Sequence, residues 1–248
     1  MNIVLFHRDE FEPGTAHELR LPVHDVRTKH ILEVLRREPH ETFRAGVVNG
    51  ELGHAEIVRR EKAMLRLRFH PESDAPDSYP VTVLLGHPRP IQLQRILRDL
   101  AAIGVGNVVV THTELGERSY FQSNIWVGDG VERSLVEGAA QGGNPRLPVV
   151  AREHTLERAI DRIEMLEPRP STRVVFDLCE NAARVAELSD FAPPVVFAVG
   201  SERGWSAGER ALLARAGYRS ARCGLRVLRT ETAAVAAAAL VLSRLGIM

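Results

Sequence analysis

Residues 195–204 read Val-Val-Phe-Ala-Val-Gly-Ser-Glu-Arg-Gly, and this stretch decides the fold. Five consecutive apolar residues are typical of a parallel strand that is covered on both faces. The two glycines after the strand let a ligand approach the backbone, since neither carries a Cβ atom. Ser206 and Glu209 then form a capping box, which marks the start of a helix. The stretch predicts a strand, a loop and a helix, with either a ligand at the loop or a tight turn that only packing requires.

Other apolar runs extend this pattern across the second half of the chain. They predict further buried strands and comprise Val81 to Leu85, Asn107 to Val110 and Val174 to Phe176. A helix is predicted to begin at Pro90, because the apolar residues after it recur at helical spacing. These residues are Leu93, Ile96, Leu97 and Leu100. Strands that alternate with helices are typical of an α/β domain with a parallel sheet.

The first 70 residues follow a different pattern of short strands and turns. Asn49-Gly50 predicts a hairpin with a type I′ turn, because both residues tolerate positive φ. Met64 to Phe69 continues with alternating apolar residues, and one helix is predicted from about Val26 to Arg37. These features indicate a small β-barrel. The segment from His70 to Ser78 is polar and proline-rich, as in a linker, so we expect one domain over residues 1–71 and another over 79–248.

Composition and charge restrict the class of protein. The chain has 248 residues, of which 44% are hydrophobic and 26% charged, with a formal net charge of zero. This composition excludes a disordered chain, and the zero net charge argues against a protein that coats nucleic acid by bulk electrostatics. The region from Val196 to Met248 has eight arginines against three glutamates, which suits contact with a phosphate backbone. A genome rich in arginine codons is the alternative reason for this excess.

Several classes of site and location are not expected. The longest apolar run, Ala233 to Leu242, has ten residues, whereas a membrane-spanning helix needs roughly 20. The N-terminal apolar segment is short and meets charge at Arg8, so we expect no signal peptide and a cytoplasmic protein without membrane contact. Cys179 and Cys223 are far apart, and the ten histidines show no ligand spacing, so we expect no metal site.

Residues 224–233 read Gly-Leu-Arg-Val-Leu-Arg-Thr-Glu-Thr-Ala and lead into an alanine-rich helix. The apolar side chains can form a slot for a flat base, and free amides at the helix start can bind polar groups. In the alternative interpretation, Thr230 or Thr232 only caps the helix and Glu231 complements its dipole.

Both stretches resemble motifs of one protein family. Gly200 to Gly204 resembles the Gly-Pro-Glu-Gly-Gly loop of the RsmE family of 16S ribosomal RNA uridine-N3 methyltransferases, and Leu225 to Ala233 resembles its Ile-Leu-Arg-x-Glu-Thr-Ala signature. Similar matches upstream are Ile103-Gly104-Val105, Glu117-Arg118-Ser119 and the stretch from Gln141 to Pro148. In the first domain the matches are His30, Val34-Leu35-Arg36 and Asn49-Gly50. The resemblance therefore covers nearly the whole chain.

The resemblance implies an N-terminal PUA-like β-barrel that binds RNA and a C-terminal SPOUT domain whose parallel sheet contains a trefoil knot. It also implies a homodimer that uses S-adenosyl-L-methionine to methylate N3 of a uridine in 16S ribosomal RNA, free or within the small ribosomal subunit. We expect the bends near residues 200 and 225 to fold together into one slot for this methyl donor. Ribose 2′-O methylation by another SPOUT branch and a catalytically silent RNA-binding paralogue are the alternatives.

The resemblance also assigns cofactor-binding residues, which are Leu178, Gly200, Ser201, Glu202, Gly204, Leu225, Leu228, Arg229 and Thr230. Several positions depart from the family pattern: Ser201 replaces a proline, Arg203 a glycine and Ala102 a glutamate, and Gly142-Gly143-Asn144 alters the stretch that begins at Gln141. These departures bear on the identity of the RNA target, and on the silent alternative, more than on the identity of the cofactor.

Methyl transfer from a sulfonium requires neither a metal nor a covalent intermediate, so the main contribution of the enzyme is positioning. The uridine must lose its N3 proton, and Arg229 is the candidate that stabilises the resulting anion. Glu231 is the candidate base, or else a residue fixed by the helix dipole. Candidate RNA contacts are the basic residues Arg27, Lys29, Arg36, Arg37, Arg118 and Arg146. A solvated helix face or surface salt bridges are the alternatives for these residues.

Overall fold

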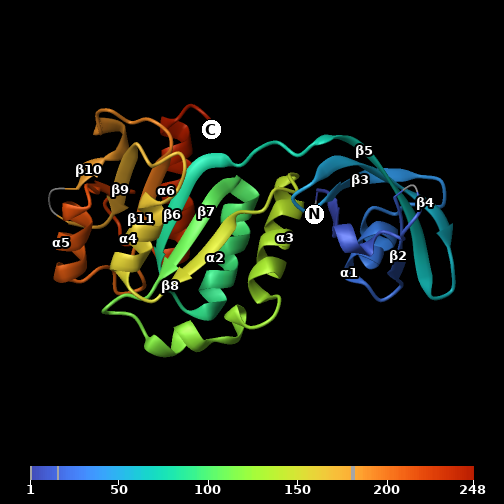
Figure 1. The fold of residues 1–248 in the computed structure, drawn as a ribbon, viewed down its shortest axis with the longest axis horizontal. Coiled ribbons are helices and arrows are strands. Elements are labelled where there is room, and N and C mark those ends of the chain that lie inside the picture. Colours follow the sequence, from blue (N-terminus) through green and yellow to red (C-terminus); the bar gives the residue numbers. More distant parts are fainter. Residues whose placement is uncertain (1, 16, 180–181) are drawn as a thin grey trace. The chain divides into compact units, whose positions relative to one another are not determined.

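The computed structural model describes residues 2–15, 17–179 and 182–248 (Figure 1). The chain divides into two compact units: unit 1 comprises Met1–Asp77 and Val136–Leu147, and unit 2 comprises Ser78–Leu135 and Pro148–Met248. The grouping of Val136–Leu147 with unit 1 has no counterpart in the sequence pattern, because contacts between residues far apart along the chain decide it.

Unit 1 contains a five-stranded sheet that curls around one core. Its strands are β1 (Val4–Phe6), β2 (Glu18–Pro22), β3 (Thr42–Val47), β4 (Glu51–Arg60) and β5 (Met64–Asp74). They lie in the order β1-β3-β4-β5-β2, in which β1 pairs with β3 in parallel and the other neighbours are antiparallel. The small barrel that the sequence predicts is thus a curled sheet with β1 and β2 at its edges.

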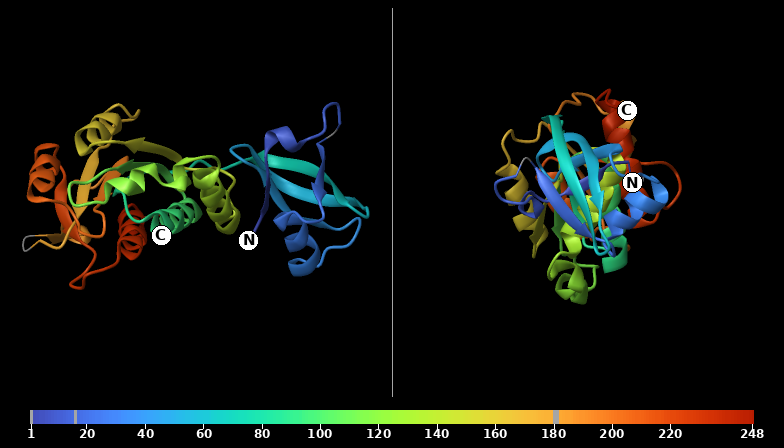
Figure 2. Two further views of the ribbon diagram at one scale, coloured as in Figure 1. Left: turned by 90° about the horizontal axis from the view of Figure 1, so that it is seen from below. Right: turned by 90° about the vertical axis from the view of Figure 1, so that its right-hand side faces the viewer.

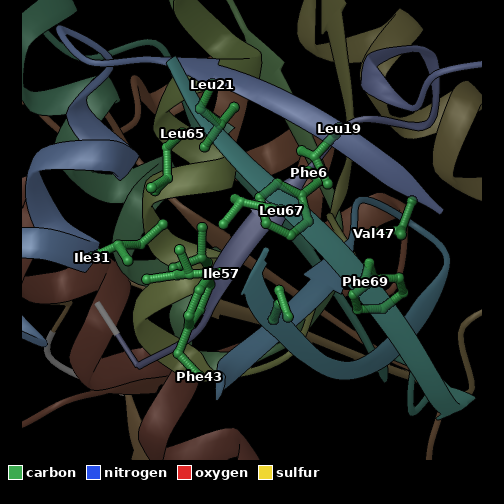
Figure 3. Close-up of a cluster of buried hydrophobic side chains, with 13 residues drawn as sticks. Phe6, Leu19, Leu21, Ile31, Phe43, Val47, Ile57, Leu65, Leu67 and Phe69 are labelled. Atoms are coloured by element: carbon green, nitrogen blue, oxygen red, sulfur yellow. The ribbon is translucent and has the colours of Figure 1, made fainter. Parts of the chain in front are cut away.

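Alternation of side chains builds the core of unit 1. Along β5, Leu65, Leu67 and Phe69 are buried, whereas the residues between them are more exposed. Figure 3 shows these side chains pointing toward Phe6 and Ile31 in one apolar cluster. Burial of apolar surface, which contributes roughly 25 cal/mol per Å², stabilises the curled sheet.

The helix predicted from about Val26 to Arg37 is shorter than expected. α1 spans Val26–Lys29 and is followed by a π-helical turn over His30–Val34. Arg36 has a left-handed backbone with φ 53°, so the helical conformation ends before it. The spacing of apolar residues indicates a helix but does not show where its backbone conformation changes or ends.

The hairpin between β3 and β4 is confirmed, but its turn is not type I′. Asn49 has a positive φ of 54° and Gly50 does not, while Gly50 N donates to Val47 O at 2.8 Å. Only Asn49 therefore adopts the left-handed conformation that the prediction assigned to both residues.

The polar segment from His70 to Ser78 is not a linker along its whole length. β5 continues through its first half to Asp74, which pairs with Glu51 of β4. Main-chain pairing thus outweighs the proline-rich composition.

Unit 2 contains a seven-stranded sheet whose neighbouring strands are all parallel. Its strands are β6 (Tyr79–Gly86), β7 (Val105–Thr111), β8 (Val149–Glu153), β9 (Thr172–Phe176), β10 (Ala183–Arg184), β11 (Val195–Val199) and β12 (Arg219–Arg222). They lie in the order β10-β12-β9-β11-β6-β7-β8. The predicted apolar runs form β6, β7, β9 and β11, which confirms the parallel sheet of an α/β domain.

Helices cover both faces of this sheet. The helices that follow α1 are α2 (Pro90–Ile103), α3 (Gly130–Gly142), α4 (Leu156–Glu164), α5 (Ala207–Arg215) and α6 (Thr230–Arg244). α4 and α5 share a buried cluster with Leu84 and Val196 of the strands. α2 and α6 pack together, and Figure 2 shows them on the opposite side of the sheet from α4. No helix in the described parts of the chain has the length and apolarity needed to span a membrane.

Candidate functional site

A pocket of about 340 Å³ lies at the carboxyl ends of β9, β11 and β12. Its lining comes from residues 176–178 at the end of β9, residues 199–204 at the end of β11 and residues 223–228 after β12 except Leu225. Arg210 of α5 and Thr230 and Ala233 of α6 complete it. The two glycine-bearing bends meet in this pocket, as the sequence predicts. Ligands of open parallel sheets bind at this edge, outside the carboxyl ends of the strands.

Glycine is required in the first bend because the backbone folds back on itself. Gly204 N donates to Ser201 O at 2.9 Å, and Gly204 has a positive φ of 70°. A Cβ atom on Gly200 would lie 2.8 Å from both Cα and C of Gly204, which is closer than side chains tolerate. The pocket wall here is therefore bare backbone.

Two side chains anchor this bend to neighbouring elements. The Ser201 hydroxyl lies 3.0 Å from the Thr113 hydroxyl, and both residues are buried. Glu202 Oε1 accepts a hydrogen bond from Arg89 N, just before α2, at 2.7 Å. Serine in place of the family's proline thus holds the loop by a hydrogen bond instead of by a rigid ring.

The predicted capping box at the start of α5 is confirmed. Ser206 Oγ accepts from Glu209 N at 3.1 Å, and Glu209 Oε2 accepts from Ser206 N at 2.8 Å. The second carboxylate oxygen of Glu209 accepts from Glu114 N at 2.9 Å. Glu209 therefore fixes both the start of the helix and the segment after β7.

The second bend places its residues differently. Arg229 is the N-cap of α6, and no side chain caps this helix, so the interpretation of Thr230 or Thr232 as a cap is wrong. Leu228, Thr230 and Ala233 line the pocket. Leu225 and Val227 are 84% and 86% exposed.

An ion pair missed in the sequence borders the pocket. Arg210 Nε of α5 donates to Asp177 Oδ2 at 2.5 Å, and Asp177 Oδ1 accepts from Leu178 N at 2.8 Å. The hydrogen bond with Asp177 raises the pKa of Arg210. One feature of the sequence could have indicated Asp177 as a site residue. It directly follows the apolar run of β9, and the carboxyl ends of parallel strands are where ligands bind.

Of the residues assigned to the cofactor by resemblance, those that line the pocket are Leu178, Gly200, Ser201, Glu202, Gly204, Leu228 and Thr230. Leu225 and Arg229 do not line it, and Arg229 is exposed. Glu231 lies in the first turn of α6 and is also outside the lining. The other lining residues, which the resemblance did not assign to the cofactor, are Phe176, Asp177, Val199, Arg203, Arg210, Cys223, Gly224, Arg226, Val227 and Ala233.

Cys223 is the thiol of the pocket wall. Burial raises its pKa to about 11, so the thiol stays neutral near pH 7 and is a poor nucleophile. No group of three or more histidine, cysteine, aspartate or glutamate side chains is placed to hold a metal ion within the described residues.

The basic side chains of unit 1 that are candidate RNA contacts differ in their exposure and in the hydrogen bonds they already make. Arg27 donates to Glu10 at 2.6 Å, to Asp25 at 2.8 Å and to Leu5 O at 3.1 Å, and its side chain is 18% exposed. Arg146 donates to Ala75 O at 3.2 Å. Arg27 and Arg146 thus hold unit 1 together, whereas Lys29 and Arg36 are exposed and Arg37 is half-buried.

Arg118 of unit 2 is exposed on the 3-10 turn Arg118–Gln122, and a histidine anchors the next 3-10 turn, Asn124–Trp126. The Trp126 indole donates to His87 Nε2 at 2.8 Å, and His87 Nδ1 lies 2.7 Å from Pro88 O. An indole N–H only donates, so His87 is neutral with its proton on Nδ1. Burial lowers the pKa of His87, which agrees with the neutral form.

Comparisons with known proteins place this arrangement in a family. A family model described as RNA methyltransferase domain matches residues 75–242. Ribosomal RNA small subunit methyltransferase E of Treponema pallidum is 34% identical over 98% of this chain and 91% of its own length. Ribosomal RNA small subunit methyltransferase E 1 of Borreliella burgdorferi is 26% identical over 99% of both chains.

Solved structures show the same fold. The structure of ribosomal RNA small subunit methyltransferase E from Neisseria gonorrhoeae, bound to S-adenosyl methionine, has a TM-score of 0.72 at 20% identity and covers 98% of each chain. A probable rRNA methyltransferase from Porphyromonas gingivalis has a TM-score of 0.75 at 21% identity, over 97% of this chain and 98% of its own. On its motifs, its sequence relatives and its fold, the chain belongs to the ribosomal RNA small subunit methyltransferase E (RsmE) family.

Proposed function

We propose that the protein transfers the methyl group of S-adenosyl-L-methionine to N3 of a uridine in 16S ribosomal RNA. The observation that carries this proposal is the single pocket in which both family motifs meet. The sequence relatives are named as methyltransferases of small-subunit ribosomal RNA, and the Neisseria gonorrhoeae neighbour binds S-adenosyl methionine. Because ribosomal RNA is the substrate, we place the enzyme in the cytoplasm.

The pocket residues fit this cofactor. A Cβ atom on Gly200 would strike the backbone of Gly204, so glycine there keeps the shape of the turn that forms this pocket wall. Phe176 and Leu228 supply apolar walls for a flat base, and a volume of about 340 Å³ lies within the range of small-molecule sites, roughly 300–1,000 Å³. We propose that backbone groups of the two bends hold the adenine and that no metal takes part.

Arg229 and Glu231, the two neighbours of the lining residue Thr230 at the start of α6, would act on the target base. When bound, S-adenosyl-L-methionine supplies an electrophilic methyl group. Arg229, between the lining residues Leu228 and Thr230, would stabilise the anion that forms when N3 loses its proton. Glu231 is the residue we propose to take that proton. Because N3 lies on the pairing edge of uracil, the target must be unpaired or flipped out.

RNA binding is proposed for the basic side chains that remain free. These are Lys29, Arg36 and Arg37 of unit 1 and Arg118 of unit 2. Arg27 and Arg146 are left out, because their hydrogen bonds already lie within unit 1. We assign RNA binding to the domain over residues 1–71 and methyl transfer to the domain over 79–248.

A homodimer is part of the proposal. Leu225 and Val227 project from the second bend with 84% and 86% of their surface exposed. Apolar side chains that are this exposed beside a functional pocket are typical of a surface that a partner covers. We propose that a second copy of the chain covers them.

Nucleoside analysis of a deletion strain tests the reaction. Mass spectrometry of digested 16S ribosomal RNA from this strain is expected to show loss of 3-methyluridine, with restoration by the wild-type gene. Loss of a 2′-O-methylated nucleoside with 3-methyluridine unchanged would instead favour the ribose methyltransferase. No change in any methylated nucleoside would favour the silent RNA-binding protein.

A further inference from the structure

Only some of the charged residues that line the pocket are paired with one another. They are Asp177, Glu202, Arg203, Arg210 and Arg226. Asp177 pairs with Arg210, and Glu202 accepts the backbone hydrogen bond from Arg89. Among the described residues, Arg203 and Arg226 have neither a hydrogen-bond partner nor an ion-pair partner. Two guanidinium groups of the pocket are therefore available to an anion.

The two arginines come from different bends. Arg203 lies in the turn closed by the hydrogen bond from Gly204 N to Ser201 O, and this turn is tied down at Thr113. Arg226 belongs to the second bend, between the exposed side chains of Leu225 and Val227. An anion that binds both arginines would therefore link the first bend, which is anchored at Thr113, to the exposed second bend.

We propose that Arg203 and Arg226 together bind the α-carboxylate of the methionine part of the cofactor. This inference rests on the proposed function. The carboxylate is the only anionic group of S-adenosyl-L-methionine, whose sulfonium and amino groups are both cationic. Uncompensated guanidinium groups would repel those cations, so the pocket accepts this ligand best when its carboxylate pairs with the arginines. Guanidinium groups also match the two oxygens of a carboxylate in geometry.

An RNA phosphate is the competing anion. An enzyme that acts on a flipped nucleotide takes the base into the pocket and leaves the phosphates along the backbone outside. Arg203 and Arg226 line the same pocket as Gly200 and Gly204. We therefore assign them to an anion of the pocket ligand, and because both side chains are exposed, a phosphate contact is an outcome that the binding experiment must distinguish.

This pairing also explains a departure from the family pattern. The position of Arg203 holds a glycine in the family's loop, which offers only backbone to a ligand. The arginine adds a cation without changing the hydrogen bond that closes the turn. The chain thus holds its cofactor with a contact that the family loop does not provide.

Two ligands that differ in the amino-acid part provide the test. S-adenosylhomocysteine contains the carboxylate, whereas 5′-methylthioadenosine lacks the whole amino-acid part. Calorimetry on the purified full chain should show that R203A and R226A each bind S-adenosylhomocysteine about tenfold more weakly, as expected for a lost charge-assisted hydrogen bond. Displacement titration should show that their affinity for 5′-methylthioadenosine is unchanged. R203K should recover part of the loss.

The matched control is R215A. Arg215 ends α5, is exposed and lies outside the pocket lining, so its removal should leave both affinities unchanged. An equal loss for both ligands in R203A would overturn the proposal, because it would mean general damage to the pocket. Unchanged S-adenosylhomocysteine affinity with weaker RNA binding would overturn it in favour of a phosphate contact. Failure of the wild-type protein to bind S-adenosylhomocysteine would instead refute the proposed function itself.

Discussion

Replacing Gly200 with alanine is expected to weaken cofactor binding by roughly 100-fold. The added Cβ atom would lie 2.8 Å from Cα and C of Gly204 and 3.2 Å from Trp205 N. These are backbone atoms that cannot rotate away, so the turn between Ser201 and Gly204 must open and the pocket wall must move. A loss of about 3 kcal/mol corresponds to a roughly 100-fold weaker affinity. Calorimetry with S-adenosylhomocysteine measures it, with circular dichroism to establish that the variant is folded.

The matched control is G208A in the first turn of α5. A Cβ atom on Gly208 would lie 3.6 Å from Glu114 Oε1 and from Ser206 Oγ, which is an ordinary contact distance. Alanine also stabilises a helix by roughly 0.5–1 kcal/mol relative to glycine. G208A should therefore bind the cofactor like the wild type and unfold at a slightly higher temperature. A folded G200A protein that binds as well as G208A would contradict the geometry of the pocket.

Replacing Arg229 with alanine is expected to lower turnover by about 100-fold while changing cofactor affinity by no more than about twofold. Arg229 is exposed and outside the lining of the pocket, so its truncation removes little packing and no contact with the cofactor. Its proposed role is to stabilise the uridine anion, an interaction that gains strength only in the transition state. Single-turnover transfer to unmodified 16S ribosomal RNA measures the chemical step.

R229K is the conservative variant for this experiment. Lysine keeps the positive charge but not the two-pronged geometry of the guanidinium, so we expect turnover between those of R229A and the wild type. Unchanged turnover in R229A would remove Arg229 from the catalytic residues. An equal loss of turnover and cofactor affinity would make it a binding residue instead.

The parallel sheet could be predicted from the sequence because its central strands are covered on both faces. Such strands are rich in consecutive apolar residues, and β6, β9 and β11 each contain a run of three to five of them. The capping box of Ser206 and Glu209 was predictable for a local reason, since both of its hydrogen bonds lie within one turn.

Features that depend on distant contacts could not be predicted. Strand β5 extends into the polar segment because β4 pairs with it. The pairing of Asp177 with Arg210 joins residues 33 positions apart, and no short motif reports such a pair. Arg27 was predicted to bind RNA, but charge alone does not reveal that the carboxylates of Glu10 and Asp25 surround it. The trefoil knot and the roles of Arg229 and Glu231 stay predictions.

Amide hydrogen exchange on the full chain, with and without saturating S-adenosylhomocysteine, tests most directly whether the two bends hold one ligand. Bound ligand slows exchange where it covers or orders the backbone. We predict slower exchange in both residues 200–204 and residues 224–230, because both bends contribute to the pocket lining, and no change in β2 or β5 of unit 1. Slower exchange in only one of the two bends, or in neither, would contradict the account.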